Sequence, residues 1–161
     1  MPNQEPSKTT GVVFTRTASV AELIEATIAS STISLDAALY RFNQRKLARA
    51  VAEAARRKVA VRVVLDLQKF EQDASTQRLV REAAIAYRLS SGREGKKSKM
   101  HHKFVILDSS LVLTGSYNWT SESEEENYEN LVILRGPNEV QAYRLEFDLL
   151  WEGAEEPGKS L

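Results

Sequence analysis

The side chains best suited to chemistry lie in one stretch of the chain, residues 100–120. This stretch contains an imidazole, an ammonium, a hydroxyl and a carboxamide, from His101, Lys103, Ser116 and Asn118. An imidazole acts as a nucleophile or a base near neutral pH, and the other three groups donate hydrogen bonds. Donors around a nucleophile suit an oxyanion with several oxygens, so these residues favour chemistry on a phosphodiester if they converge.

A β-hairpin would make the four side chains converge. Two short apolar segments flank a turn-forming run at 108–110, which predicts two paired strands. With a two-residue tip, Lys103 lies opposite Ser116 and His101 lies opposite Asn118, and residues opposite each other in an antiparallel pair share a face. A Ser-Ser pair is an unfavoured tip, and a three-residue loop would shift this register by one position.

The same spacing resembles the signature of the phospholipase D superfamily, HxK(x)4D(x)6GSxN. The matching residues are His101, Lys103, Asp108, Gly115, Ser116 and Asn118. Glu129, just before an apolar strand at 131–134, is similar to an acidic residue that supports the histidine in that family. The resemblance covers nearly all of residues 11–151 and is strongest to the small single-motif bacterial endonucleases. It implies hydrolysis of a phosphodiester without a metal or another cofactor.

The resemblance also implies a role for each residue. His101 of one subunit would form a phosphohistidine, and His101 of a second subunit would act as the general acid. Lys103, Ser116 and Asn118 would hold the non-bridging oxygens of the phosphate. Glu129 would accept a hydrogen bond from the imidazole and set its tautomer.

The number of histidines independently favours a homodimer. His101 and His102 are the only two, and adjacent residues of a strand point to opposite faces. The pair therefore cannot easily serve one phosphate, and a second copy of the chain would supply the acid by meeting the same patch across a two-fold axis.

The neighbours of these residues are expected to be structural. Strand parity turns Asp108 away from Lys103, which favours a role in fixing the turn. His102 is expected to face away, in the core or at an interface. Tyr117 and Trp119 are expected in the core on the non-catalytic face, and Gly115 is expected to relieve crowding against a neighbouring strand.

The remaining segments predict an α/β protein with a mixed, phospholipase D-like β-sheet covered by helices on both faces, an α-β-α sandwich. The expected strands are 11–15, 32–40, 59–65 and 85–89, followed by the hairpin and a last strand at 131–134. The expected helices are 19–29, 44–58, 76–84 and 138–151. Residues 11–152 would form one domain between a disordered tail at 1–10 and a flexible tail at 153–161.

Three segments between these elements are candidates for binding. The run 90–99 is expected to be a basic loop at the rim of the site, where it either guides a nucleic-acid backbone or is simply solvated. Its candidate substrate-binding residues are Arg93, Lys96, Lys97 and Lys99. The loop 40–43 would line a pocket or plug it with aromatic rings. The glutamates of 121–129 are consecutive and lack other ligand types, so we do not expect a metal site there.

Composition sets limits on function. The chain has 161 residues, 22 basic and 22 acidic residues, and no cysteine. It therefore has no disulfides, and its net charge attracts neither nucleic acid nor anionic membranes in bulk. Without an apolar run or signal peptide it is expected to be soluble, in a compartment left open. We expect a nuclease acting on DNA or RNA. The alternatives are a hydrolase of phosphatidyl lipids or cardiolipin, and a non-catalytic nucleic-acid-binding module.

Overall fold

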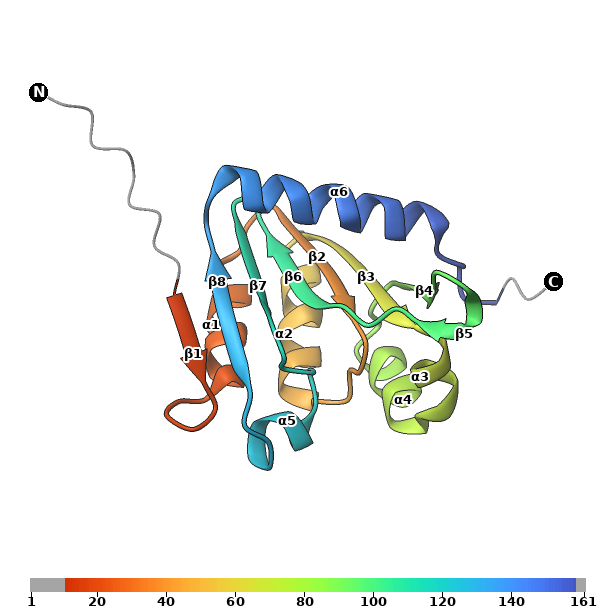
Figure 1. Ribbon diagram of the computed structural model, residues 1–161, viewed down its shortest axis with the longest axis horizontal. Helices are drawn as coiled ribbons and strands as arrows, with labels where there is room; N and C mark the ends of the chain where they lie inside the picture. The colour runs from red at the N-terminus through yellow and green to blue at the C-terminus, as the bar shows by residue number, and fades with distance from the viewer. Residues whose placement is uncertain (1–10, 159–161) are drawn as a thin grey trace, which may run out of the picture.

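The computed structural model describes residues 11–158, which form one eight-stranded sheet with helices on both faces (Figure 1). The strands are β1 (Gly11–Phe14), β2 (Ser34–Leu39), β3 (Ala60–Asp66), β4 (Tyr87–Gly92), β5 (Gly95–Lys99), β6 (Lys103–Leu107), β7 (Leu111–Gly115) and β8 (Asn130–Leu134). The helices are α1 (Val20–Ser30), α2 (Arg45–Arg56), α3 (Leu67–Gln72), α4 (Ala74–Glu82), α5 (Ser121–Glu125) and α6 (Pro137–Gly153).

The sheet is mixed, as predicted, with the strand order β1-β8-β7-β6-β2-β3-β4-β5. Strands β2, β3 and β4 run parallel and are joined by helical crossovers. Strand β6 pairs antiparallel with β2, and β7, β8 and β1 continue the antiparallel half. The two halves therefore meet at β2 and β6, and this junction carries the reactive residues.

The two faces of the sheet are covered by different helices, which confirms the α-β-α sandwich. On one face, α1, α2 and α4 pack against buried side chains such as Ala37 and Val105. On the other, α6 lies across the sheet and packs against Ala38 and Phe104 (Figure 1). Each strand of the centre thus alternates between two cores, which explains its nearly continuous apolar sequence.

Several predicted boundaries are wrong. Residues 90–99 form no loop, because the end of β4 and all of β5 make an antiparallel hairpin. Helices α3 and α5 occupy segments expected to be irregular. The C-terminal segment is not loose where it is described, since Glu155 exchanges two backbone hydrogen bonds with Leu89, of 2.9 and 2.8 Å. The predicted tail at 1–10 and residues 159–161 lie outside the described residues.

The hairpin of β6 and β7 also has a different register from the one predicted. Phe104 pairs with Thr114 and Leu107 with Leu111, which leaves a three-residue loop at 108–110. Each pairing is displaced by one position, so the expected pairs of Lys103 with Ser116 and of His101 with Asn118 do not form. Asp108 and Ser109 have φ values of 51° and 52°, a left-handed tip that Asp tolerates better than most residues.

Asp108 fixes this turn, as its strand parity predicted. Its Oδ1 accepts hydrogen bonds from the backbone N–H groups of Ile33 and Ser34, of 2.8 and 3.0 Å. Its Oδ2 accepts a bond of 3.0 Å from the Thr32 N–H. The carboxylate therefore ties the hairpin tip to the start of β2, at the end of β6 remote from Lys103.

Candidate active site

The candidate site lies at the edge of the sheet where β2 and β3 end and β6 begins. His101 sits in the short connection between β5 and β6, exposed to solvent. Its ring packs on Tyr40, the first residue after β2, with 4.3 Å between ring centroids. This position agrees with the general location of sites at the carboxyl ends of parallel strands.

Lys103 is the immediate partner of His101. Its Nζ donates a 2.9 Å hydrogen bond to the backbone oxygen of His101 and lies 3.3 Å from the imidazole Nδ1. An ammonium only donates, so Nδ1 accepts this contact and the neutral ring carries its proton on Nε2. The HxK spacing thus folds an ammonium back onto its own histidine.

The surroundings of both residues favour their neutral forms. Burial lowers the pKa of His101, and the ammonium groups of Lys103 and Lys99 lower it further. Burial also lowers the pKa of Lys103, against the opposing attraction of Glu129. The lowered pKa favours the neutral imidazole, whose unprotonated nitrogen in this structure is the Nδ1 that accepts the contact from Lys103.

Ser116 and Glu129 form a second cluster beside this pair. The Ser116 hydroxyl donates a hydrogen bond to Glu129 Oε2 and accepts one of 3.1 Å from the Asn130 N–H. Asn127 Nδ2 donates to Glu129 Oε1 at 3.3 Å. Glu129 was expected to accept a hydrogen bond from the imidazole; in this structure its carboxylate instead accepts from Ser116 and Asn127, and His101 contacts Lys103.

Asn118 carries a buried polar atom that needs a partner. Its Oδ1 is the one buried side-chain oxygen or nitrogen among the described residues without a hydrogen bond. The flanking rings of Tyr117 and Trp119 are 1 % and 2 % exposed, which confirms their prediction as core residues. Because both neighbours are anchored in the core, the backbone at Asn118 is fixed at this edge of the sheet.

The turn after β7 depends on Gly115. A Cβ atom at this position would lie 2.2 Å from the backbone oxygen of Asn130 on β8. The crowding expected at Gly115 is therefore present, and it brings Ser116 within hydrogen-bonding distance of β8.

Asp66 is a positioning residue that the sequence alone did not reveal. It ends β3 and is 1 % exposed. Its Oδ2 accepts a 2.8 Å bond from the Met100 N–H, next to His101, and its Oδ1 accepts a 2.9 Å bond from the Lys69 N–H at the start of α3. The sequence did contain a signal for this role, because Asp66 is an acidic residue at the carboxyl end of a buried apolar strand. The loop 40–43 follows the neighbouring parallel strand β2 at the same edge of the sheet.

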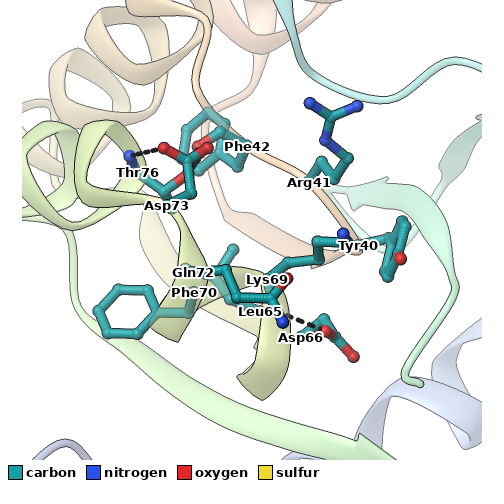
Figure 2. Close-up of a pocket in the computed structure, with 10 residues that line it drawn as sticks. All are labelled: Tyr40, Arg41, Phe42, Leu65, Asp66, Lys69, Phe70, Gln72, Asp73 and Thr76. Atoms are coloured by element: carbon teal, nitrogen blue, oxygen red, sulfur yellow. Dashed lines mark hydrogen bonds between the residues drawn. The ribbon is translucent and has the colours of Figure 1, made fainter. Parts of the chain in front are cut away.

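Two pockets flank His101. The first has a volume of about 260 Å³, and Tyr40, Arg41 and Phe42 form part of its lining, which confirms the loop 40–43 as a pocket wall (Figure 2). The second has about 490 Å³ and is lined by His101 itself, and by Arg93 and Lys99 of the predicted basic segment. Lys96 and Lys97 are exposed on β5.

His102 contacts α6, but it is exposed rather than buried, and it lines the pocket of about 490 Å³ together with His101. Its Nε2 lies 2.9 Å from Glu146 Oε1 on α6, and its ring packs edge-on against Phe104. The part of the chain that the structure describes contains no group of three His, Cys, Asp or Glu side chains placed to hold a metal ion.

A mixed α/β sheet that presents His-x-Lys and Gly-Ser-x-Asn at one edge defines a phospholipase D-like domain. A family model described as "Cardiolipin synthase, PLD-like domain" matches residues 24–151. The chain therefore belongs to the phospholipase D superfamily.

Among curated proteins, the chain is 38% identical over 119 residues to a mitochondrial cardiolipin hydrolase of Xenopus laevis, covering 74% of this chain and 55% of the relative. It is 34% identical over 134 residues to the Mus musculus mitochondrial cardiolipin hydrolase, covering 83% of this chain and 58% of the relative. The chain thus spans between half and two-thirds of the length of these relatives.

Two solved structures share the fold over almost their whole length. Nuc, a phospholipase D family member from Salmonella typhimurium, superposes with a TM-score of 0.82 at 25% identity, covering 93% of this chain and 98% of Nuc. NucT from Helicobacter pylori also gives a TM-score of 0.82, at 22% identity, covering 92% of this chain and 98% of NucT.

Proposed function

We propose that this chain is a metal-independent phosphodiesterase that cleaves DNA or RNA through a phosphohistidine on His101, at an interface between two copies of the chain. The observation that carries the proposal is the contact of Lys103 Nζ with the imidazole, 3.3 Å from Nδ1, at the same sheet edge as the Ser116 hydroxyl and the Asn118 carboxamide, whose Nδ2 is a donor. One nucleophile and three donors are the groups that an attack on phosphorus requires.

The reaction follows from these groups. An imidazole nitrogen of His101 attacks phosphorus while the bond to the leaving oxygen breaks, and a second acid donates the proton that this oxygen needs. Water then attacks the phosphohistidine, its proton passes to the group that served as acid, and His101 is released. The bound phosphate is a stronger acceptor than Nδ1 for the Lys103 ammonium, which therefore moves from the ring to the substrate.

The acid is the reason for proposing a dimer. His102 lines the same pocket as His101, but its Nε2 is already engaged by Glu146 on α6, so we do not assign the proton transfer to it. Glu129 already accepts the Ser116 proton in a hydrogen bond. A second His101, presented by a copy related by a two-fold axis, supplies the missing proton donor.

A lipid substrate is the second candidate. It is favoured by the names of the relatives, which are cardiolipin hydrolases. The same groups would attack the phosphodiester of a phosphatidyl lipid, because the chemistry at phosphorus does not depend on the attached alcohol. Among residues 11–158, no helix is both long and apolar enough to span a membrane.

One set of assays separates these functions. Purified protein is incubated in excess EDTA with labelled single- and double-stranded DNA and RNA, and in parallel with vesicles containing cardiolipin or phosphatidylcholine. We expect nucleic-acid cleavage that His101→Ala abolishes and that the control His102→Ala retains. Acid quenching should trap labelled phosphate on His101. Hydrolysis of the lipid alone would replace the nuclease by the second candidate, and activity of His101→Ala on either substrate would refute the mechanism.

Mixing subunits tests the shared site. Wild-type and His101→Ala chains are co-refolded in increasing ratios, and activity is measured per wild-type subunit. If each site needs both copies of His101, activity falls as heterodimers replace wild-type homodimers. Constant activity per wild-type subunit would exclude a shared site.

A further inference from the structure

Three ammonium groups surround one aromatic ring beside the candidate active site. The Nζ atoms of Lys69, Lys99 and Lys103 lie 5.6, 5.8 and 5.3 Å from the ring centroid of Tyr40. The three lysines come from α3, β5 and β6, so the fold gathers them from separate elements. Figure 2 shows the Lys69 side chain extending along the pocket wall toward Tyr40.

These charges lack acidic partners. Within residues 11–158, none of the three ammonium groups forms an ion pair. Two acids do line the adjoining pocket, and neither forms an ion pair with these lysines: Asp66 is oriented by two backbone N–H groups, and Asp73 by the Ser75 and Thr76 groups that begin α4. The ring attracts each ammonium, yet like charges around one ring repel one another, so the cluster favours an anion.

Only one of the three ammonium groups is needed at the phosphate that is cleaved. Lys103 is bonded to His101 and belongs to the reaction centre. Lys69 lines the pocket of about 260 Å³ together with Tyr40, and Lys99 lines the pocket of about 490 Å³ beside His101, so the two lysines approach the Tyr40 ring from neighbouring pockets. Two free cations and an adjoining pocket remain for another anionic group of the same substrate.

We propose that Lys69 and Lys99 form a second phosphate subsite, occupied by the phosphodiester next to the scissile one on a polynucleotide strand. This inference rests on the proposed nuclease function and deepens it, because it makes two consecutive phosphates the feature that the enzyme recognises. A strand presents phosphates at a regular interval, and lysines near an aromatic ring are typical of grooves that follow a single-stranded backbone. A diphosphatidyl lipid also carries two phosphodiesters, so the experiment includes both sources.

The test compares one phosphodiester with several. The kcat/KM values of wild type, Lys69→Ala and Lys69→Arg are measured with bis(4-nitrophenyl) phosphate and with a single-stranded oligonucleotide. We expect Lys69→Ala to lower kcat/KM for the oligonucleotide, relative to kcat/KM for bis(4-nitrophenyl) phosphate, about 10-fold. Lys69→Arg should restore this ratio. Arg56→Ala is the matched control, because it removes one positive charge at the C-terminal end of α2, at the opposite edge of the sheet.

Binding provides a readout that does not depend on turnover. The affinity for a fluorescent phosphorothioate strand, which resists cleavage, is measured at several salt concentrations. Removing one phosphate contact should reduce the slope of log K against log salt by about 0.7 in Lys69→Ala, and not at all in Arg56→Ala.

The outcomes separate this inference from the nuclease proposal. If the wild-type chain is an active nuclease, but Lys69→Ala changes neither the kcat/KM ratio nor the slope of log K against log salt, the second subsite is refuted. The nuclease proposal is then unaffected. A wild-type chain that neither cleaves nor binds the strand overturns both. If Lys69→Ala instead lowers hydrolysis of cardiolipin relative to phosphatidylcholine, with no effect on the strand, the assignment to a polynucleotide is wrong.

Discussion

Asp108 belongs to the signature that defines the site, yet the structure places it where it can affect only stability. Its carboxylate accepts hydrogen bonds from three backbone N–H groups, at Thr32, Ile33 and Ser34. The five residues of β6 separate it from Lys103 by on the order of 15 Å at the usual rise of a strand. We therefore expect Asp108→Ala to destabilise the protein without impairing the chemistry.

The magnitude follows from the bonds lost. Hydrogen bonds to a charged acceptor contribute about 1.5–3 kcal/mol each, but water can replace the acceptor at the exposed Thr32 and Ile33 groups. The free energy of unfolding should therefore fall by about 2 kcal/mol. For a chain of this length, a loss of that size lowers Tm by about 4–8 °C. Ser109→Ala is the control, because Ser109 shares the left-handed tip with a φ of 52°.

The pH dependence gives a second check. Partial burial alone would raise the pKa of Asp108, but hydrogen bonds from Ser34, Ile33 and Thr32 outweigh it and hold the pKa below its ordinary value. A carboxyl whose pKa is lower in the folded chain stabilises the fold above its unfolded pKa of about 3.9. That contribution is lost as the pH falls through the lower, folded pKa. The stability difference between wild type and Asp108→Asn should therefore shrink in acid.

Urea unfolding followed by tryptophan fluorescence, together with kcat measured on fully folded protein, decides the question. A variant of unchanged stability whose kcat falls more than about 10-fold, a loss of about 1.4 kcal/mol in transition-state stabilisation, would refute the structural role. Equal stability of wild type and Asp108→Ala at neutral pH would refute the account of the turn.

The remaining predictions concern the other end of the hairpin. Gly115→Ala should lower the free energy of unfolding by about 3 kcal/mol, because the new Cβ would meet backbone atoms of Asn130 at 2.2 and 3.0 Å. Gly153→Ala is the control and should cost nothing, because the space around Gly153 is open. Equal urea midpoints for wild type and Gly115→Ala would contradict this prediction. Lys99→Ala should move the acid limb of the kcat/KM profile to higher pH, because burial, Lys103 and Lys99 together lower the pKa of His101 and one of these causes is removed. An acid limb that stays in place would show that Lys99 does not act on the imidazole.

Local patterns in the sequence predicted the elements and the motif, and tertiary contacts decided the rest. The hairpin was predictable because two apolar segments flank a turn run, but its register depends on the turn. The side chain of Asp108 selects a three-residue loop by reaching Thr32 and Ile33 across the sheet. No local propensity contains that contact, so the shift by one position could not be chosen from the hairpin alone.

The basic segment at 90–99 was assigned the wrong secondary structure, because its composition is that of a loop. Residues 90–99 contain glycine, serine and charges, a composition typical of loops. The segment 95–99 nevertheless forms the edge strand β5, because it pairs with β4. That pairing fixes Lys99 beside Tyr40, a placement that sequence position alone did not give. Lys69 was missed for a related reason, since α3 has only six residues and begins at a cap supplied by Asp66.

Charge is where the sequence was least informative. A balance of 22 basic and 22 acidic residues predicts little attraction for a polyanion. In the structure, Asp66, Asp73 and Asp108 accept backbone N–H groups at turns and helix starts. Among the described residues, Lys69, Lys99 and Lys103 converge on Tyr40 without forming an ion pair. A neutral chain thus acquires a local cationic edge, because folding gathers lysines of three separate elements around one ring.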